Sequence, residues 1–195
     1  MTTEKLTATD HVSSGLTCNL KAGEEAQATG VFEIKCHDKD GNLKWEAQSK
    51  NLVVNVGLAY MAGSALTGAA PVTQITAWYL GLYGAGASNT PAAGDTMSSH
   101  AGWTEVVAYS NATRVAATFA IATTANPSVV TNSASPATFN INGTTTVGGA
   151  FLTSGSAKSG TTGTLFSAAD FGSPGDRSVV SSDTLSVTYT FSLAG

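Results

Sequence analysis

The residues best suited to acid–base chemistry lie close together in the chain. Asp95, His100 and Glu105 fall within one short stretch, and Ser98 and Ser99 precede the histidine. A hydrolase needs a carboxylate pair, or a nucleophile that neighbouring groups hold and activate. Adjacency in sequence does not supply that geometry, and the chain has no G-x-S-x-G nucleophile elbow. We predict no catalytic residue here.

A structural role fits the same stretch better. Asp95 is expected to cap a turn through the backbone, with Thr96 assisting, because Asp and Thr side chains bond nearby backbone groups in turns. Glu105 is expected to pair with Arg114 across neighbouring strands, since each of the two residues begins a β-like run. With Trp103, these residues predict a loop that holds one backbone shape.

The cysteines and histidines do not predict a metal site. Cys18 and Cys36 are the only cysteines, and His11 and His37 lie near them. Their spacing matches no common zinc pattern, and adjacent residues of a strand point to opposite faces of its sheet. We expect two reduced thiols and no bound metal or cofactor.

Two further motifs have structural interpretations. The glycine-rich run at 81–86 follows a strand but lacks the spacing and the Lys-Ser/Thr pair of phosphate loops, so we expect it to permit turning or close packing. Asp38 and Asp40 could suggest a calcium loop, but Gly41 comes two places too early and no Glu closes the loop. Asp40-Gly41 predicts a hairpin turn instead.

The three tryptophans leave two interpretations open. Trp45, Trp78 and Trp103 could form a platform on which a sugar ring stacks. A single tryptophan on a strand is more often part of a core or an interface anchor, and we favour that interpretation for each of them.

Charge is distributed very unevenly along the chain. Charged residues make up 11% of 195 residues, and residues 1–50 carry most of them. A neutral surface over the remainder predicts either coverage by other protein, which we favour, or a rigid β-rich surface decorated with Ser and Thr. The net charge of −4 includes no basic patch, so we expect no nucleic-acid partner. No apolar run predicts a membrane span, and the first residues lack an export signal.

The chain reads as a tail followed by one β-rich domain. Residues 1–29 lack periodicity and predict an extended N-terminal arm. Residues 31–47 alternate apolar and polar side chains around the Asp40-Gly41 turn, which predicts a hairpin. Residues 51–54 predict a short strand or the entry to a helix, and residues 55–66 predict the one short helix.

Residues 30–195 predict a mainly β domain, an antiparallel two-sheet sandwich of jelly-roll type. The clearest strand is TLSVTYTFSL, where Leu185, Val187 and Tyr189 alternate with hydroxyl residues. The run ITAWYLGLY is apolar throughout, so we expect its strand to be buried on both faces. Further strands are expected in EVVAY, RVAATFAIA, SVV, TFNI and VGGAFLT.

Several of these segments together resemble tailed-bacteriophage virion proteins. The resemblance covers about residues 31–193 and rests on DKDGNLKWEA, NLVVNVGL, WYLGLYG, GDTMSSHAGWTEVVAY and Arg114. It includes the closing motif Ser182-Asp183-Thr184-Leu185, which has Ser where Gly is common in that group.

The resemblance implies a structural protein of the virion and no enzyme. Several members of the group are small β-sandwich decoration, or cement, proteins that bind the outer head shell, and others belong to the tail or fibres. We therefore expect a decoration protein on the capsid surface, assembled in the host cytoplasm, with the major capsid protein as partner and a homotrimer as the favoured oligomer. The alternative is a tail or fibre-associated sandwich that binds a host-surface glycan or another tail protein.

Overall fold

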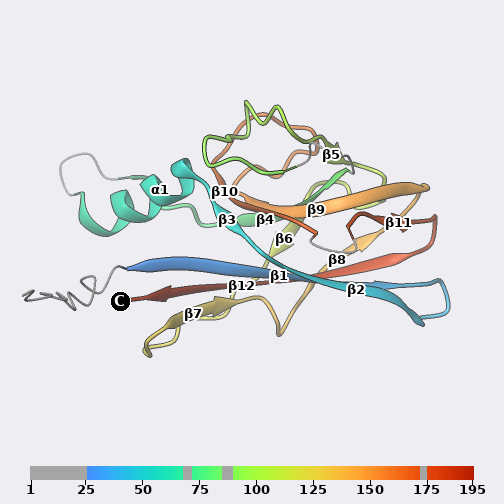
Figure 1. The fold of residues 1–195 in the computed structure, drawn as a ribbon, viewed down its shortest axis with the longest axis horizontal. Helices are drawn as coiled ribbons and strands as arrows, with labels where there is room; N and C mark the ends of the chain where they lie inside the picture. The colour runs from blue at the N-terminus through green and yellow to red at the C-terminus, as the bar shows by residue number, and fades with distance from the viewer. Residues whose placement is uncertain (1–25, 68–71, 85–89, 172–174) are drawn as a thin grey trace, which may run out of the picture.

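Two antiparallel β-sheets packed face to face form the body of the protein (Figure 1). The computed structural model describes residues 26–67, 72–84, 90–171 and 175–195. Within these ranges it contains twelve strands and one helix, which confirms the predicted mainly β, two-sheet architecture. The first sheet contains β1 (Gln27–His37), β2 (Leu43–Lys50), β7 (Ser128–Thr131), β8 (Ala137–Asn140) and β12 (Thr184–Ala194). The second contains β3 (Leu52–Val53), β4 (Trp78–Gly84), β5 (Glu105–Val106), β6 (Val115–Ala117), β9 (Thr145–Thr153), β10 (Leu165–Asp170) and β11 (Arg177–Val179).

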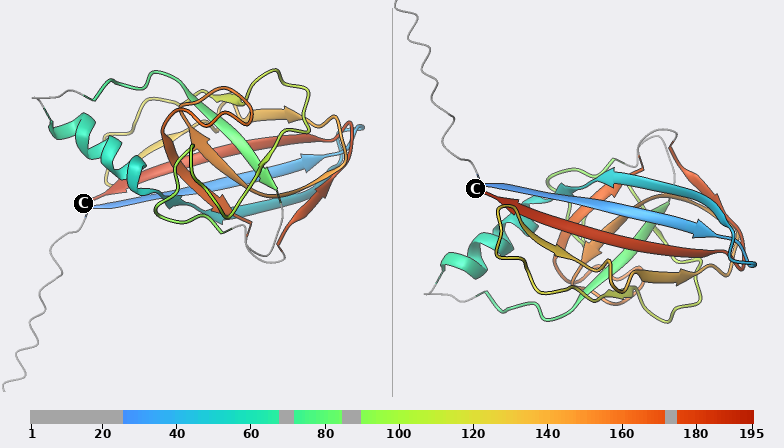
Figure 2. Two further views of the ribbon diagram at one scale, coloured as in Figure 1. Left: turned by 90° about the horizontal axis from the view of Figure 1, so that it is seen from above. Right: turned by 90° about the horizontal axis from the view of Figure 1, so that it is seen from below.

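The first sheet is built around its two longest strands. β1 and β12 pair along their full lengths, from Gln27 opposite Ala194 to His37 opposite Thr184. Figure 2 shows the two strands side by side in both views. The predicted hairpin joins β1 to β2, and Asp38 Oδ1 accepts bonds from the backbone N–H groups of Asp40 and Asn42, at 2.9 Å each. Those bonds close the turn.

A side chain completes the other edge of β12. β7 pairs with the second half of that edge and β8 with the first half, so neither reaches the middle. Asn132 lies between them, fully buried, and its amide Nδ2 donates to Val187 O at 3.2 Å while its Oδ1 accepts from Tyr189 N at 2.6 Å. The amide thus takes the place of a backbone partner, and the ladder continues unbroken.

The second sheet has the order β3-β10-β9-β4-β5. β10 and β11 lie end to end along one edge of β9, and β5 and β6 lie end to end along the outer edge of β4. Residues 80–83 in the middle of β4 are all buried, as predicted for a strand covered on both faces. At Gly81 an added Cβ would lie 2.2 Å from the Phe151 ring, so the glycine permits close packing.

The chain passes from one sheet to the other at Asn51, between β2 and β3. Asn51 donates its backbone N–H to Gly30 O at 2.9 Å and its Nδ2 to the Tyr189 hydroxyl at 2.7 Å. Ser167 of the second sheet donates to the same hydroxyl at 3.1 Å. A Cβ on Gly30 would lie 2.7 Å from this hydroxyl, so the corner requires glycine.

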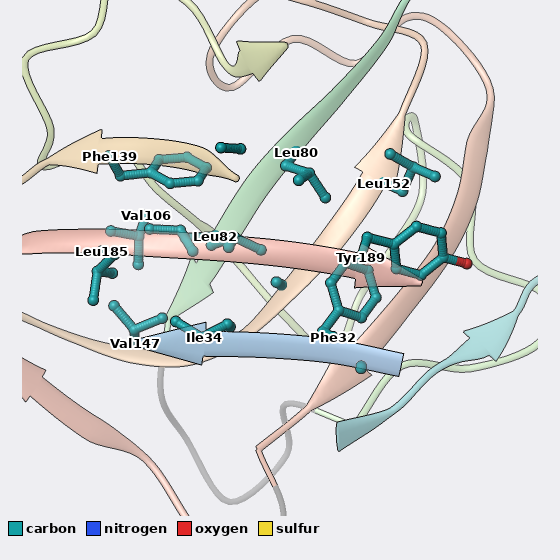
Figure 3. Packing of buried hydrophobic residues seen from close by; sticks show 14 of the residues in the cluster. Phe32, Ile34, Leu80, Leu82, Val106, Phe139, Val147, Leu152, Leu185 and Tyr189 are labelled. Atoms are coloured by element: carbon teal, nitrogen blue, oxygen red, sulfur yellow. The ribbon is translucent and has the colours of Figure 1, made fainter. Parts of the chain in front are cut away.

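Apolar side chains of the two sheets fill the space between them. Figure 3 shows Phe32 and Ile34 of β1 facing Leu82 of β4, with Leu185 of β12 in the same layer. Each of these side chains is at most 1% exposed. The sandwich therefore has the dry, interdigitated core that the alternation in β1 and β12 predicts.

The predicted helix is present as α1 (Asn55–Leu66). Val56, Tyr60 and Met61 are partly buried on one side, and Gly57 is buried against the backbone of Phe166. A Cβ at Gly57 would lie 2.3 Å from Phe166 O, so the helix approaches β10 closely only because residue 57 is glycine. Of the described part of the chain, no helix is long and apolar enough to cross a membrane.

The observed elements differ from the predicted ones at three places. β1 begins at Gln27, so residues 27–29 belong to the sheet and not to the predicted arm; residues 1–25 lie outside the described residues. β10 and β11 were not predicted, because β10 is buried at five of six positions and shows no alternation, and β11 is only three residues long. β5 and β6 are shorter than the predicted EVVAY and RVAATFAIA strands.

Substitution Asn132→Ala tests the side-chain completion of the β12 ladder. We expect a loss of about 2–4 kcal/mol in the free energy of unfolding, because a buried N–H and a buried C=O each lose a partner. Chemical denaturation measures it. Asn142→Ala, at an exposed position, is the matched control and should stay within about 0.5 kcal/mol of the parent protein. Equal losses in the two variants would contradict the role of Asn132.

Candidate functional site

A buried arginine is the centre of the predicted site. Arg114 is 1% exposed. It is the last residue of the segment that joins β5 to β6, and its side chain contacts the loop at 154–164 that joins β9 to β10. Its Nη1 donates to Gly155 O at 2.9 Å and its Nη2 to Gly160 O at 3.0 Å. The guanidinium carbon lies 5.2 Å from the centroid of the Phe151 ring. The cation therefore fixes one turn of the long loop against the sheet.

Glu105 neutralises this cation with a two-point contact. Arg114 Nε donates to one carboxylate oxygen at 2.9 Å, and Nη2 donates to the other at 2.7 Å. The second oxygen also accepts the backbone N–H of Ser159 at 2.7 Å. Such parallel, charge-assisted bonds are the strong geometry for an arginine–carboxylate pair.

The predicted Glu105–Arg114 contact is present, but its predicted geometry is wrong. The two residues do not face each other across neighbouring strands. Glu105 starts β5, and Arg114 directly precedes β6; both strands lie end to end on the same edge of β4. The chain between them leaves the edge and returns to it, and the ion pair holds the two ends of that excursion together.

Two more contacts attach the loop at 154–164. Lys158 donates to Tyr109 O at 2.6 Å, and its ammonium lies 3.9 Å from the centroid of the Tyr109 ring. The backbone N–H of Arg114 donates to Ser156 O at 2.8 Å. Ser159 adopts a φ of 54° at the position where the loop meets Glu105. Two cations thus hold the loop in place: Arg114, which lies outside the loop, and Lys158, which belongs to it.

Asp95 caps a turn, as the sequence predicts, and also contacts a tryptophan. Its Oδ2 accepts the Ala92 N–H at 2.9 Å and the Trp103 indole N–H at 3.0 Å. Thr96 Oγ1 accepts the Ser99 N–H at 3.0 Å, which closes the following turn. The carboxylate therefore joins the two ends of the loop through one oxygen.

His100, one of the three residues considered for acid–base chemistry, lines a cavity. It stacks on Trp103 with ring centroids 3.9 Å apart, and its Nδ1 lies 2.9 Å from Trp103 O. In the described part of the chain, Asp95 bonds to Trp103 and Glu105 bonds to Arg114, and neither carboxylate forms a hydrogen bond with the imidazole. A cavity of about 220 Å³ lies here, lined by Met97, His100, Thr104, Glu105, Ser159 and Thr161 among others.

The tryptophans occupy separate environments. Trp103 is 4% exposed and packs on Tyr83 and Phe151. Trp45 contacts Phe171, and Trp78 contacts Phe166. Each tryptophan thus belongs to its own aromatic cluster, and the predicted core role describes Trp103 best.

Cys36 is a free, buried thiol. Burial, and then the nearby Asp183 carboxylate, raise the pKa of Cys36 to about 11. In the part of the chain that the structure describes, no three His, Cys, Asp or Glu side chains are placed to hold a metal ion. Cys18 and His11 lie outside the described residues.

Sequence reasoning missed a third buried carboxylate, Asp183, at the end of the sandwich opposite to α1. Asp183 is 2% exposed, accepts Lys44 Nζ at 2.6 Å and caps the turn from Val180 by accepting its N–H at 2.8 Å. The bond to Asp183 raises the pKa of Lys44. Ser182 in this turn has a φ of 75°, at the third position of a type II turn, where glycine is preferred. The sequence signal for this turn was Ser182, which stands where the closing motif commonly has Gly.

The comparisons with known proteins give no relative. No protein-family model, curated protein or solved structure matches the chain. The resemblance to phage virion proteins stays a prediction from the short motifs quoted above, two of which contain residues of this site.

Substitution Glu105→Gln tests the buried ion pair. We expect the free energy of unfolding to fall by about 3–5 kcal/mol, because the variant leaves the Arg114 charge buried without a countercharge. Urea unfolding followed by tryptophan fluorescence measures the change. Asp40→Asn removes an exposed ion pair with Lys39 and should leave stability unchanged. A Glu105→Gln protein as stable as this control would show that the pair has no structural role.

Two glycine substitutions in one turn should have opposite effects. Ser182→Gly relieves the left-handed backbone strain, and we expect a gain of about 0.5–1 kcal/mol after the larger unfolded-state entropy of glycine is subtracted. Ser181→Gly, where φ is negative, brings only the entropy cost and should lose about 0.5–1 kcal/mol. Thermal unfolding of both variants measures the difference, and a change of the same sign in both would refute this account.

Proposed function

We propose that this protein is a structural component of a tailed-phage virion, a decoration protein that binds the outer head shell. The observation that carries the proposal is where the few charges of residues 51–195 lie. These residues hold eight Asp, Glu, Lys and Arg side chains. Four of the eight side chains are at most 9% exposed and serve internal contacts: Asp95, Glu105, Arg114 and Asp183. The outer surface of most of the sandwich is thus nearly uncharged.

The outward side of β12 illustrates this neutral surface. Leu185, Val187 and Tyr189 are buried, and the alternating positions on the opposite side of the strand from 184 to 192 all carry hydroxyls: Thr184, Ser186, Thr188, Thr190 and Ser192. Thr131 of β7 bonds Thr190 across this face at 2.9 Å. Protein interfaces are depleted of charge at their centres and use many hydrogen bonds. The outward side of β12 offers both properties, and Glu33 and Lys35 of β1 lie opposite Thr188 and Ser186 at its border.

A decoration role needs binding and stability rather than turnover. Asp95, Glu105 and Arg114 form hydrogen bonds that hold loops in place. This supports a binding role for the surface around those loops. Copies that contact several capsomers at once gain affinity through effective concentration, and a closed homotrimer suits local three-fold positions of a shell. A tail or fibre protein that binds a host-surface glycan is the competing function, and the separate placement of the tryptophans disfavours it.

Occupancy on purified shells tests the proposal. We expect the protein in virions at a copy number comparable with that of the major capsid protein, measured by quantitative mass spectrometry. Ser186→Lys places a charge on the hydroxyl face and should reduce binding to undecorated shells at least tenfold. Gln48→Lys adds the same charge to β2 on the same sheet and should bind like the parent protein.

Other outcomes of this experiment overturn the proposal. A few copies per particle would indicate a tail or connector protein. Binding to host cells or glycans without binding to shells would support the fibre alternative. Equal binding of the two lysine variants would reject the hydroxyl face as the contact surface.

A further inference from the structure

An apolar groove opens at the end of the sandwich beside α1. It encloses a cavity of about 210 Å³ between the two sheets. Its lining includes side chains from the helix, from both sheets and from the segment after β6: Met61, Trp78, Phe119, Val130, Phe166 and Phe191. An apolar cavity of about 150 Å³ is large enough to bind benzene, so this groove can take one or two aliphatic side chains.

The groove is a continuation of the main core that the described residues leave uncovered. Phe166 contacts both Trp78 and Phe191 edge to face, with ring centroids 5.4 Å apart in each pair. Phe166 is 7% exposed, whereas Trp78 and Phe191 are only partly buried. Apolar surface in water costs about 25 cal/mol per Å², so an apolar cover over these rings would stabilise the fold.

The N-terminal segment is attached close to this groove. Gly30 of β1 lies opposite Phe191, and β1 begins three residues earlier, about 10 Å along the strand. α1, the start of β1 and the C-terminus lie at the same end of the molecule in Figures 1 and 2. Residues 1–25 are joined to the chain at this point, beside the opening.

One part of that segment matches the groove in chemistry. Residues 12–20 contain no Asp, Glu, Lys or Arg, and within them Leu16, Cys18 and Leu20 alternate with polar residues. The groove lining is likewise uncharged. The seven Cα-to-Cα steps from Leu20 to Gln27 span at most roughly 23–25 Å, which is enough for the chain to turn back from the start of β1 to the groove. A tether this short gives a high effective concentration, which favours the segment of the same chain over a second copy.

We propose that Leu16–Leu20 of the same chain binds in this groove and covers the open end of the core. The leucine side chains enter between the aromatic rings, and the polar residues between them face water. This inference rests on the fold and the tether alone, and it stands whether or not the protein binds a phage shell.

The natural thiol of Cys18 provides the test. In full-length Met61→Cys protein, mild oxidation should convert most molecules to an intramolecular disulfide with Cys18, seen as a faster-migrating monomer on a non-reducing gel. Leu43→Cys places a thiol on β2 near the hairpin, at the opposite end of the sandwich, and should give no such product. Cys36 is buried with a raised pKa, and adding Cys18→Ser to Met61→Cys should abolish the disulfide.

Three results of the oxidation overturn the proposal. A disulfide-linked dimer would show that the segment binds a second copy, and absence of any disulfide would show that Leu16–Leu20 is elsewhere. Equal cross-linking of the Met61→Cys and Leu43→Cys proteins would show that the segment has no preferred position.

A second measurement avoids changes in the groove itself. Leu16→Ser with Leu20→Ser should uncover the rings and raise the fluorescence of a bound apolar dye several-fold, while Leu6→Ser should not. An unchanged dye signal in the double variant would contradict the proposal independently of the cross-linking.

Discussion

The buried guanidinium of Arg114 constrains the structure more than any other single group. A cation removed from water needs a countercharge and acceptors for its N–H groups, or the fold loses several kcal/mol. Glu105 of β5 and the carbonyls of Gly155 and Gly160 in the loop at 154–164 meet that need. The requirement of one side chain thereby sets the positions of β5, β6 and the loop at 154–164 relative to one another.

Buried polar side chains also complete hydrogen bonds at three other places where strands end. Asn132 replaces a missing backbone partner in the β12 ladder, Asn51 secures the crossing between sheets, and Asp183 closes the turn before β12. Each of these polar groups completes hydrogen bonds at a place where a strand ends, because buried backbone groups require partners. Apolar packing supplies the core of the sandwich, and these few polar contacts determine where its strands begin and end.

The sequence predicted what depends on local pattern. Alternation in β1 and β12, the spacing in α1 and the Asp40-Gly41 turn each specify an element without knowledge of its neighbours. β10 escaped prediction because a strand buried on both faces has no alternation to detect. Asn132 and Asp183 escaped because their partners lie far away in sequence. The Glu105–Arg114 contact was predicted because each residue begins a β-like run, but its geometry depends on the pairing of β5 and β6 with β4, which the two residues alone could not reveal.

The pairing of β1 with β12 has a consequence for how the chain folds. Both are inner strands of the first sheet, and residues 38–183 separate them in sequence. Loop-closure entropy must be overcome before this ladder forms, and topologies of this kind fold in milliseconds to seconds. During synthesis the edge of β1 that pairs with β12 stays unpaired until β12 has been made, and unpaired strand edges are prone to aggregation. The centre of the first sheet is therefore completed only after β12 has been synthesised.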